Sequence, residues 1–244
     1  MDTTVSTFLT QVKNRLIESL QPSGWASALR MYLNSSDFTE LLEVLYEDSR
    51  NGKNFTPELK YVFCALIECP FEQTNVIVLG QDPYPHMGVA DGISFSCSRT
   101  GKAQPSLQYI FGAIKQTVYP HVPSVVDFEM DPDLSRWSRQ GVLLLNSALT
   151  CQIGKVGSHY ERWKEFIVYL IDVINFNRPG TIFVLLGKKA QEYESLIMQQ
   201  NVILTASHPA STAYMKQKQW DCNDIFNQIN RQLERLDKPA IHWI

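Results

Sequence analysis

The sequence predicts an α/β fold with a central four-stranded parallel sheet flanked by helices. Two observations carry this prediction. Segments with helical spacing alternate with short apolar runs, and such alternation indicates a parallel sheet. The runs are nearly continuous in Val, Ile and Leu, which is typical of strands buried on both faces. They cover residues 75–80, 141–147, 181–187 and 201–207.

The N-terminal segment 1–20 is amphipathic and predicts a helix. Its apolar residues on one helical face are Phe8, Val12, Leu16 and Leu20. The segment lacks the apolar centre and small-residue cleavage site of a signal peptide. We expect the helical part of the chain up to about residue 70 to pack on the sheet.

Three further helices are expected between and after the strands. The longest covers 160–177, with an apolar face that includes Trp163, and the Pro-Gly pair at 179–180 would end it. A shorter helix is predicted over 188–200. The last covers 221–236, where Asp221 is a candidate cap for its first turn.

Length and composition indicate one globular domain spanning 1–244. The 244 residues are 44% hydrophobic and 19% charged, without low-complexity runs or repeats. No segment approaches membrane-spanning length, so we expect a soluble cytoplasmic monomer without a membrane partner. The five cysteines are odd in number and form no CxxC pair, which argues against disulfide or zinc frameworks.

The formal net charge of −3 gives no global basic signature of nucleic-acid binding. A basic groove can nevertheless lie on an acidic body, and an enzyme must release its product. Composition therefore leaves the partner open.

Chemically useful side chains follow each predicted strand. The strands end in "GQDPYP", "NSALT", "GKKAQ" and "SHPAST". The carboxyl ends of parallel strands face the ligand crevice, so these loops should converge on one site. The side chains expected to meet there are Asp82, Asn146, Lys188 and His208.

Asp82 and His208 are the candidate catalytic pair. Asp82 precedes Pro83, which stiffens the loop, and a fixed carboxylate can orient water or stabilise positive charge. An Asx turn is the structural alternative. A neutral His208 could donate to an oxygen that becomes negative, but a histidine held for structural reasons is equally compatible with the sequence.

The remaining polar and aromatic residues suit a planar ligand. Asn146 offers a donor and an acceptor on one amide, which matches a nucleobase edge, although it could also cap a turn. Phe95 and Tyr84 flank a Gly-rich segment and could stack on a base, although aromatics usually serve the core.

Together these motifs resemble the uracil-DNA glycosylases of family 1. The chain has "GQDPYP" and "GISFS" where that family has a GQDPYH-type loop and GLSFS. It has "GVLLLNSALT" for GVLLLNTVLT and "SHP" for the start of HPSPLS. Shorter similarities include "LLGKKAQ" and "KPAIHWI", and the resemblance spans at least residues 62–243. It implies a uracil-DNA glycosylase-like fold.

The resemblance implies a role for each pocket residue. Asp82 would position the hydrolytic water and stabilise the oxocarbenium-like sugar, and His208 would donate to the uracil oxygen that gains charge. No metal or organic cofactor is expected. The uracil-binding residues would be Gln81 through its backbone, Tyr84 against the C5 position, Phe95 by stacking and Asn146 at the base edge.

Three loops resemble the segments with which the family grips the DNA backbone. They cover 102–107, 187–189 and 208–216. The implied DNA-binding residues are Pro105, Ser106, Lys188, Ser211, Thr212, Tyr214 and Lys216. Lys189 and Lys218 are more simply read as solvated surface charges.

The chain departs from the family pattern at two places. Pro85 stands where many members have His, so stiffness would replace that side chain's contacts at Asp82. Thr212 stands where the family has the leucine that wedges into the vacated base stack, and a short polar side chain is a weaker wedge. Tyr214 or Met215 could take over that task.

We therefore expect a monofunctional uracil-DNA glycosylase that starts base excision repair by acting on single- or double-stranded DNA. Its DNA face is also a candidate surface for a protein inhibitor. One alternative is a non-catalytic DNA-binding or scaffold relative with the same fold. Another is a nucleotide-binding α/β hydrolase that acts on free nucleosides.

Overall fold

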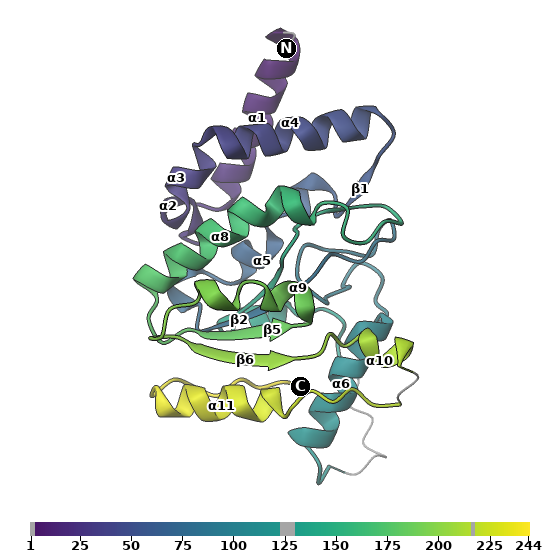
Figure 1. Ribbon diagram of the computed structural model, residues 1–244, viewed down its shortest axis with the longest axis vertical. Helices are drawn as coiled ribbons and strands as arrows, with labels where there is room; N and C mark the ends of the chain where they lie inside the picture. The colour runs from purple at the N-terminus through teal and green to yellow at the C-terminus, as the bar shows by residue number, and fades with distance from the viewer. Residues whose placement is uncertain (1–2, 123–129, 216–217) are drawn as a thin grey trace.

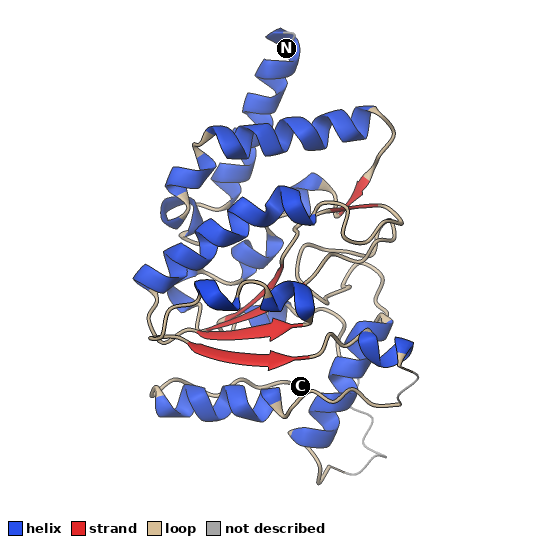
Figure 2. Ribbon diagram, in the orientation of Figure 1, coloured by secondary structure: helices blue, strands red, loops and turns tan. Residues whose placement is uncertain are grey.

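The computed structural model describes residues 3–122, 130–215 and 218–244. Its centre is a four-stranded parallel sheet in the order β3-β2-β5-β6 (Figures 1 and 2). The strands are β2 (Val76–Gly80), β3 (Val142–Asn146), β5 (Ile182–Leu186) and β6 (Val202–Ala206). All four predicted strands are confirmed. Every residue of β2, β3 and β5 is buried, which explains their uninterrupted apolar sequences.

Helices cover both faces of the sheet. Figure 1 shows α8 (Tyr160–Asn177) between the sheet and α4 (Ser36–Arg50), and α11 (Ile225–Arg235) on the opposite face. The predicted helix over 160–177 is confirmed, and Trp163 and Phe166 on its apolar face are fully buried. Four more helices each follow a loop. The longest of them is α6 (Pro105–Thr117), and the other three are single turns: α7 (Ser135–Ser138), α9 (Lys188–Gln191) and α10 (Ser211–Tyr214).

The N-terminal part is helical, as expected. It comprises α1 (Thr3–Ser19), α2 (Trp25–Ala28), α3 (Arg30–Leu33), α4 and α5 (Cys64–Glu68), with short 3₁₀ turns at Leu59–Tyr61 and Phe71–Gln73. Of the four apolar residues on the predicted face, Phe8 is 48% exposed, and its ring lies against Tyr46. Leu9, Leu16 and Leu20 form the buried face instead.

A two-stranded antiparallel ladder connects this N-terminal part to the sheet's carboxyl edge. Strand β1 (Phe55–Thr56) pairs with β4 (Cys151–Gln152). The ladder lies beyond the end of β3, so it anchors a loop that starts near the candidate site. Among the described residues, no helix is both long and apolar enough to cross a membrane.

Two predicted helix boundaries are wrong. The helix expected over 188–200 stops at Gln191 and is followed by a separate 3₁₀ turn, Glu194–Leu196. The last helix begins at Ile225, because Asn223 and Asp224 adopt φ of 52° and 54°, a left-handed backbone that α-helix cannot include. Asp221 caps a turn instead and accepts a hydrogen bond from the Asn223 N–H at 3.0 Å.

Candidate active site

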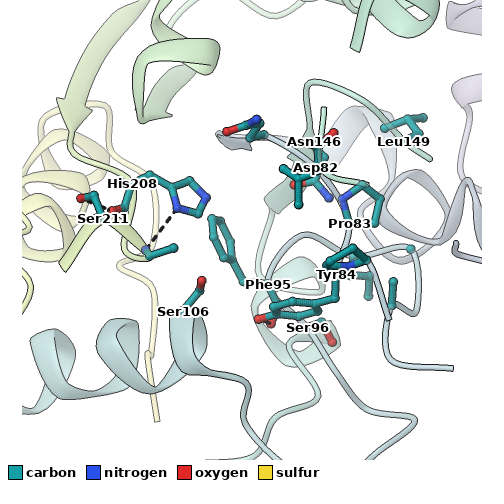
Figure 3. Close-up of a pocket in the computed structure, with 17 residues that line it drawn as sticks. Asp82, Pro83, Tyr84, Phe95, Ser96, Ser106, Asn146, Leu149, His208 and Ser211 are labelled. Carbon is teal, nitrogen blue, oxygen red and sulfur yellow. Dashed lines mark hydrogen bonds between the residues drawn. The ribbon is translucent and has the colours of Figure 1, made fainter. Parts of the chain in front are cut away.

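The carboxyl ends of β2, β3 and β6 meet at a cavity of about 310 Å³ (Figure 3). Eight of the predicted site residues line it: Gln81, Asp82, Tyr84, Phe95, Ser106, Asn146, His208 and Ser211. The loops after three separate strands therefore converge, as the topology predicts. Lys188, the fourth side chain expected to meet there, is not among the lining residues and is exposed at the start of α9.

Asp82 is held by a contact from a distant part of the chain. Its Oδ2 accepts a hydrogen bond from the Gly157 N–H at 3.0 Å, so this oxygen is held by a residue outside its own turn. Its Oδ1 is buried and has no hydrogen-bond partner among the described residues. Burial raises the pKa of Asp82, although the hydrogen bonds from Gly157 and Gln81 oppose that rise.

The loop around Asp82 is braced by residues 151–157, which we call the bracing turn. The Cys151 thiol donates to the Pro83 carbonyl at 3.4 Å, and the Gly154 N–H donates to the Pro85 carbonyl at 2.8 Å. With the Gly157 contact, three points fix the loop from one side. Pro85 thus lies in a stiff loop with its carbonyl engaged, consistent with the stiffening role expected for it.

His208 has a defined proton arrangement. Its Nδ1 accepts a hydrogen bond from the Ala210 N–H at 3.2 Å, so the proton of the neutral ring lies on Nε2. Burial lowers the pKa of His208 to about 4, which keeps the ring neutral at neutral pH. Gly187 has φ of 86°, and a Cβ there would lie 2.8 Å from the His208 Cβ, so the close approach of the two loops requires glycine.

Phe95 provides a flat wall between the two titratable groups. Figure 3 shows Asp82 and His208 on opposite sides of the pocket with the Phe95 ring between them. The ring centroids of Phe95 and His208 are 5.7 Å apart. Phe95 is a non-glycine residue with φ of 65°, a costly backbone conformation that needs support from its surroundings. The Tyr84 hydroxyl gives part of that support by donating to the Phe95 carbonyl at 2.9 Å.

The amide of Asn146 is oriented by a neighbour. The Ser94 hydroxyl donates to Asn146 Oδ1 at 2.7 Å. This leaves one oxygen lone pair and the NH₂ group for a ligand. A Cβ at Gly80 would lie 2.7 Å from both Asn146 Oδ1 and Ser94 Oγ, so glycine at the end of β2 makes room for this pair.

Sequence reasoning missed Asp91, which organises the loop that carries Phe95. Its buried carboxylate accepts four hydrogen bonds: from Ile93 N at 3.1 Å, Ser96 Oγ at 2.6 Å, Ser98 N at 2.9 Å and Ser98 Oγ at 2.7 Å. Four donors hold the carboxylate and fix the loop backbone. The signal was present as an Asp-Gly pair followed by serines, a pattern typical of a side-chain-stabilised turn.

The first turns of α6 and α10 lie at the cavity, and two lysines begin α9. Pro105 and Ser106 begin α6, and the first free N–H groups of this helix point along its axis, out of its N-terminal end. The Ser211 hydroxyl donates to the His208 carbonyl at 2.7 Å. Lys188 is exposed, whereas Lys189 is paired with Glu192 at 2.9 Å and lies over the Tyr160 ring.

The structure does not support the expectation that Thr212 contacts DNA. Thr212 is fully buried, and within the described part of the chain its hydroxyl has no hydrogen-bond partner. Its position in α10 turns it into the protein, away from any surface that DNA could reach. Met215 is 54% exposed. For Tyr214 the structure describes only the backbone, in α10, and Lys216 lies outside the described residues.

Within residues 3–122, 130–215 and 218–244, no group of three or more His, Cys, Asp or Glu side chains is placed to hold a metal ion. The pocket thus combines one carboxylate with a buried free oxygen, one neutral imidazole with a free N–H, an oriented amide and an aromatic wall. Together these groups can stabilise positive charge on one side of a planar ligand and negative charge on the other, without proton transfer from an acid.

Comparison with known proteins agrees with this geometry. The family model of the uracil DNA glycosylase superfamily matches residues 67–234. The protein named uracil-DNA glycosylase from Acinetobacter baumannii (strain SDF) is 33% identical over 235 residues, which cover 96% of each chain. The chain belongs to the uracil-DNA glycosylase superfamily. A Pseudomonas aeruginosa member is 34% identical and covers 91% of this chain and 93% of its own.

Solved structures of superfamily members have the same fold. The mimivirus uracil-DNA glycosylase has a TM-score of 0.79 at 23% identity and covers 93% of this chain and 88% of its own. The enzyme from Nitratifractor salsuginis has a TM-score of 0.62 at 22% identity, covering 88% of this chain and 96% of its own. The predicted uracil-DNA glycosylase-like fold is therefore confirmed.

Proposed function

We propose that this chain is a monofunctional uracil-DNA glycosylase of family 1. It flips uracil out of single- or double-stranded DNA and hydrolyses the N-glycosidic bond, the first step of base excision repair. The observation that carries the proposal is one cavity in which Asp82 and a neutral His208 lie on opposite sides of the Phe95 ring. The "GQDPYP" and "GVLLLNSALT" motifs support assignment to family 1.

The two titratable groups suit the charge separation of this reaction. Breaking the bond between C1′ and N1 leaves positive charge on the sugar and negative charge on uracil. Ionised Asp82 stabilises the sugar, and its unpartnered Oδ1 accepts a hydrogen bond from the water that attacks C1′. His208 Nε2–H donates to the uracil oxygen that gains charge, and one such donor contributes about 3 kcal/mol, roughly a hundredfold in rate.

Base selection follows from the oriented amide and the Tyr84 ring. Uracil presents an N3–H donor next to the O4 acceptor, which complement the free Asn146 lone pair and NH₂ group. Cytosine presents the opposite pattern. Because Ser94 holds Asn146 Oδ1, the amide cannot rotate to suit cytosine without losing that bond. Tyr84 stands against C5, where the methyl group of thymine would clash, while Gln81 contributes its backbone.

DNA is gripped at the rim of the cavity. Pro105 begins α6, and the backbone N–H groups that follow it, starting with that of Ser106, face a phosphate. Ser211 and Lys188 contact the neighbouring backbone, and we propose DNA contacts also for Tyr214 and for Lys216, which lies outside the described residues. A local patch of this kind is compatible with a net charge of −3.

The burial of Thr212 favours one alternative, a DNA-binding relative that has lost efficient flipping. Without an apolar side chain at this position, the flipped state has less support. Met215, three residues further along the chain, is exposed, and its unbranched apolar side chain suits the gap that a flipped base leaves in the stack. The retained Asp82, His208 and Asn146 constellation makes the catalytic function the better-supported one.

The partners and organisation follow from the same proposal. A mimivirus UNG variant of the same fold is described in complex with UGI, with a TM-score of 0.79 at 24% identity. We propose that the DNA face of this chain is also a surface for a protein inhibitor. We further propose that the chain acts as a monomer in the cytoplasm and that 1–244 is a single domain whose first 70 or so residues support the sheet.

Excision from an oligonucleotide with one uracil tests the proposal. In the presence of a chelator, the purified chain is expected to release free uracil and leave an abasic site that alkali cleaves. Free deoxyuridine is expected to stay intact, which separates this function from a nucleoside hydrolase. A folded protein that binds the oligonucleotide and releases no uracil would instead support the non-catalytic relative.

A further inference from the structure

The bracing turn that holds Asp82 is itself closed by two hydrogen bonds at its base. Thr150 Oγ1 and His159 Nδ1 are 2.8 Å apart, and both residues are buried. One step further into the turn, the Gln152 N–H donates to the Ser158 hydroxyl at 2.7 Å. The tip, with Gly154 and Gly157, therefore projects from a fixed base toward the loop around Asp82.

The proton positions in this base are determined by a neighbouring tryptophan. Trp163 Nε1–H donates to Thr150 Oγ1 at 2.7 Å, so the Thr150 hydroxyl proton is free to point at His159 Nδ1. Burial and the Arg162 guanidinium lower the pKa of His159 to about 4, so the ring is neutral. The proton of the neutral ring then lies on Nε2, which faces Asp48 Oδ2 at 3.9 Å.

Asp48 connects this base to the N-terminal helices. It is a buried residue of α4, its Oδ2 is bound by the Arg162 guanidinium, and its Oδ1 lies 3.5 Å from Lys53 Nζ. A second hydrogen bond joins the bracing turn to the N-terminal part of the chain. The Ile153 N–H donates to the Asn54 carbonyl at 2.9 Å, next to the β1–β4 ladder. His159, directly before α8, thus lies between Asp48 of α4 and Thr150 at the base of the bracing turn.

We propose that His159 is a positioning residue for Asp82, which it serves by clamping the base of the bracing turn with Thr150. The proposal rests on the proposed glycosylase function. When the clamp is intact, Gly157 N–H points at Asp82 Oδ2 and leaves Oδ1 free for water. When the clamp is broken, the turn tip shifts, and a displacement of about 1 Å is enough to cost roughly a hundredfold in rate.

A broken clamp has a second consequence that a purely structural role would lack. The Gly157 N–H stabilises the ionised carboxylate, so its loss raises the pKa of Asp82 and moves the acid limb of kcat to higher pH. Other ionisable groups near Asp82 are the Cys151 thiol, whose pKa burial raises to about 12, the Tyr84 hydroxyl, whose pKa burial also raises, and His208 across the cavity. Near His159 they are Asp48, Arg162 and Lys53, and despite burial the contacts with Arg162 and Lys53 hold the pKa of the Asp48 carboxyl below its usual value.

The test compares two matched pairs of variants on a uracil-containing oligonucleotide. Thr150→Val removes the hydroxyl and Thr150→Ser keeps it. His159→Asn keeps an acceptor near the Nδ1 position, whereas His159→Gln places its amide near Nε2. We expect Thr150→Val and His159→Gln to lower kcat about tenfold to a hundredfold with little change in KM and with the acid limb shifted to higher pH. Thr150→Ser and His159→Asn are expected to recover most of kcat.

A spectroscopic measurement covers the case in which a variant folds poorly. In the NMR spectrum of the wild-type protein, the Gly157 amide is expected to be protected from exchange and to shift as Asp82 titrates. Thr150→Val is expected to abolish that coupling in whatever fraction remains folded. Variants that lower Tm but leave kcat, the acid limb and the Gly157 amide unchanged would overturn the proposal. A wild-type protein that releases no uracil would instead contradict the proposed function.

Discussion

The two sides of the pocket are held in different ways. On the Asp82 side, contacts come from residues some 70 positions further along the chain, through Cys151, Gly154 and Gly157. On the His208 side, the contacts to the histidine are local: Ala210 N–H reaches its Nδ1 and the Ser211 hydroxyl its carbonyl. The acid therefore depends on the rest of the fold, and the histidine depends mainly on the shape of its own turn.

This difference predicts where substitutions at a distance will matter. Changes in the N-terminal helices or the bracing turn are expected to act on the Asp82 side, because that is where their contacts lead. Changes outside residues 207–212 should affect His208 mainly where they alter Gly187 or Phe95, which lie close to it, or Trp220, whose indole donates to Ser207. The variants below test each side directly.

Removing the charge of Asp82 is expected to have the largest effect. Asp82→Asn keeps the size of the side chain and an oxygen for the Gly157 N–H but loses the negative charge that stabilises the sugar. We expect the single-turnover rate of uracil release to fall by about a thousandfold. DNA affinity, measured separately by fluorescence anisotropy, should stay within a few-fold. A loss of less than tenfold would show that the Asp82 carboxylate does not supply the main stabilisation of the positive charge on the sugar.

Removing the imidazole of His208 is expected to be the next largest effect. His208→Ala deletes the Nε2–H donor, which is worth roughly a hundredfold in rate. His208→Gln is the matched control, because its amide can place an N–H near the Nε2 position and should recover part of the loss. If both variants were equally slow, the role of His208 would be the shape of its turn and not hydrogen bonding to uracil.

Tyr84 is expected to control base selection more than rate. Tyr84→Ala opens space at C5, so thymine release from a T-containing oligonucleotide should become measurable, and discrimination should fall by about a hundredfold. Tyr84→Phe keeps the ring and loses only the hydrogen bond to the Phe95 carbonyl. It should still reject thymine while slowing uracil release slightly. Thymine release by the Phe variant, or none by the Ala variant, would contradict this role.

The two neighbouring lysines of α9 give the smallest expected effect. Lys188 is exposed at the start of α9, whereas Lys189 is engaged by Glu192 and Tyr160. Lys188→Ala should raise KM a few-fold for every DNA sequence and reduce the slope of log K against log salt by about 1. Lys189→Ala should leave both quantities unchanged. Equal effects of the two variants would remove the assignment of Lys188 to the DNA face.

The sequence was sufficient for the strands and for the meeting of Asp82, Asn146 and His208. Uninterrupted apolar runs mark strands covered on both faces, and the topology of a parallel sheet then brings the residues after them together. The same reasoning placed Lys188 on this edge of the sheet. It could not tell that Lys188 is exposed and does not line the cavity, because a side chain's direction at the start of a helix depends on tertiary packing.

Other features depend on contacts between residues far apart in the chain. Nothing local in Gly157 indicates that its N–H meets a carboxylate 75 positions earlier, and His159 resembles any buried histidine until Thr150 and Asp48 are seen beside it. Thr212 is a different kind of error. Because it stands where the family has a wedging leucine, it was expected to be exposed at the DNA face. The turn of α10 buries it instead.

The pH dependence of uracil release tests the central claim most directly, namely that an ionised Asp82 and a neutral His208 act together. Burial raises the pKa of Asp82, so its ionised form is lost as pH falls through that raised value. The pKa of His208 is lowered to about 4, so its neutral form is lost only below that pH. Single-turnover rates should therefore rise with pH on the acid side and stay level through neutral pH. A rate that falls as pH rises between about 5 and 8, where an unperturbed histidine titrates, would show that a protonated imidazole is required and would contradict the account.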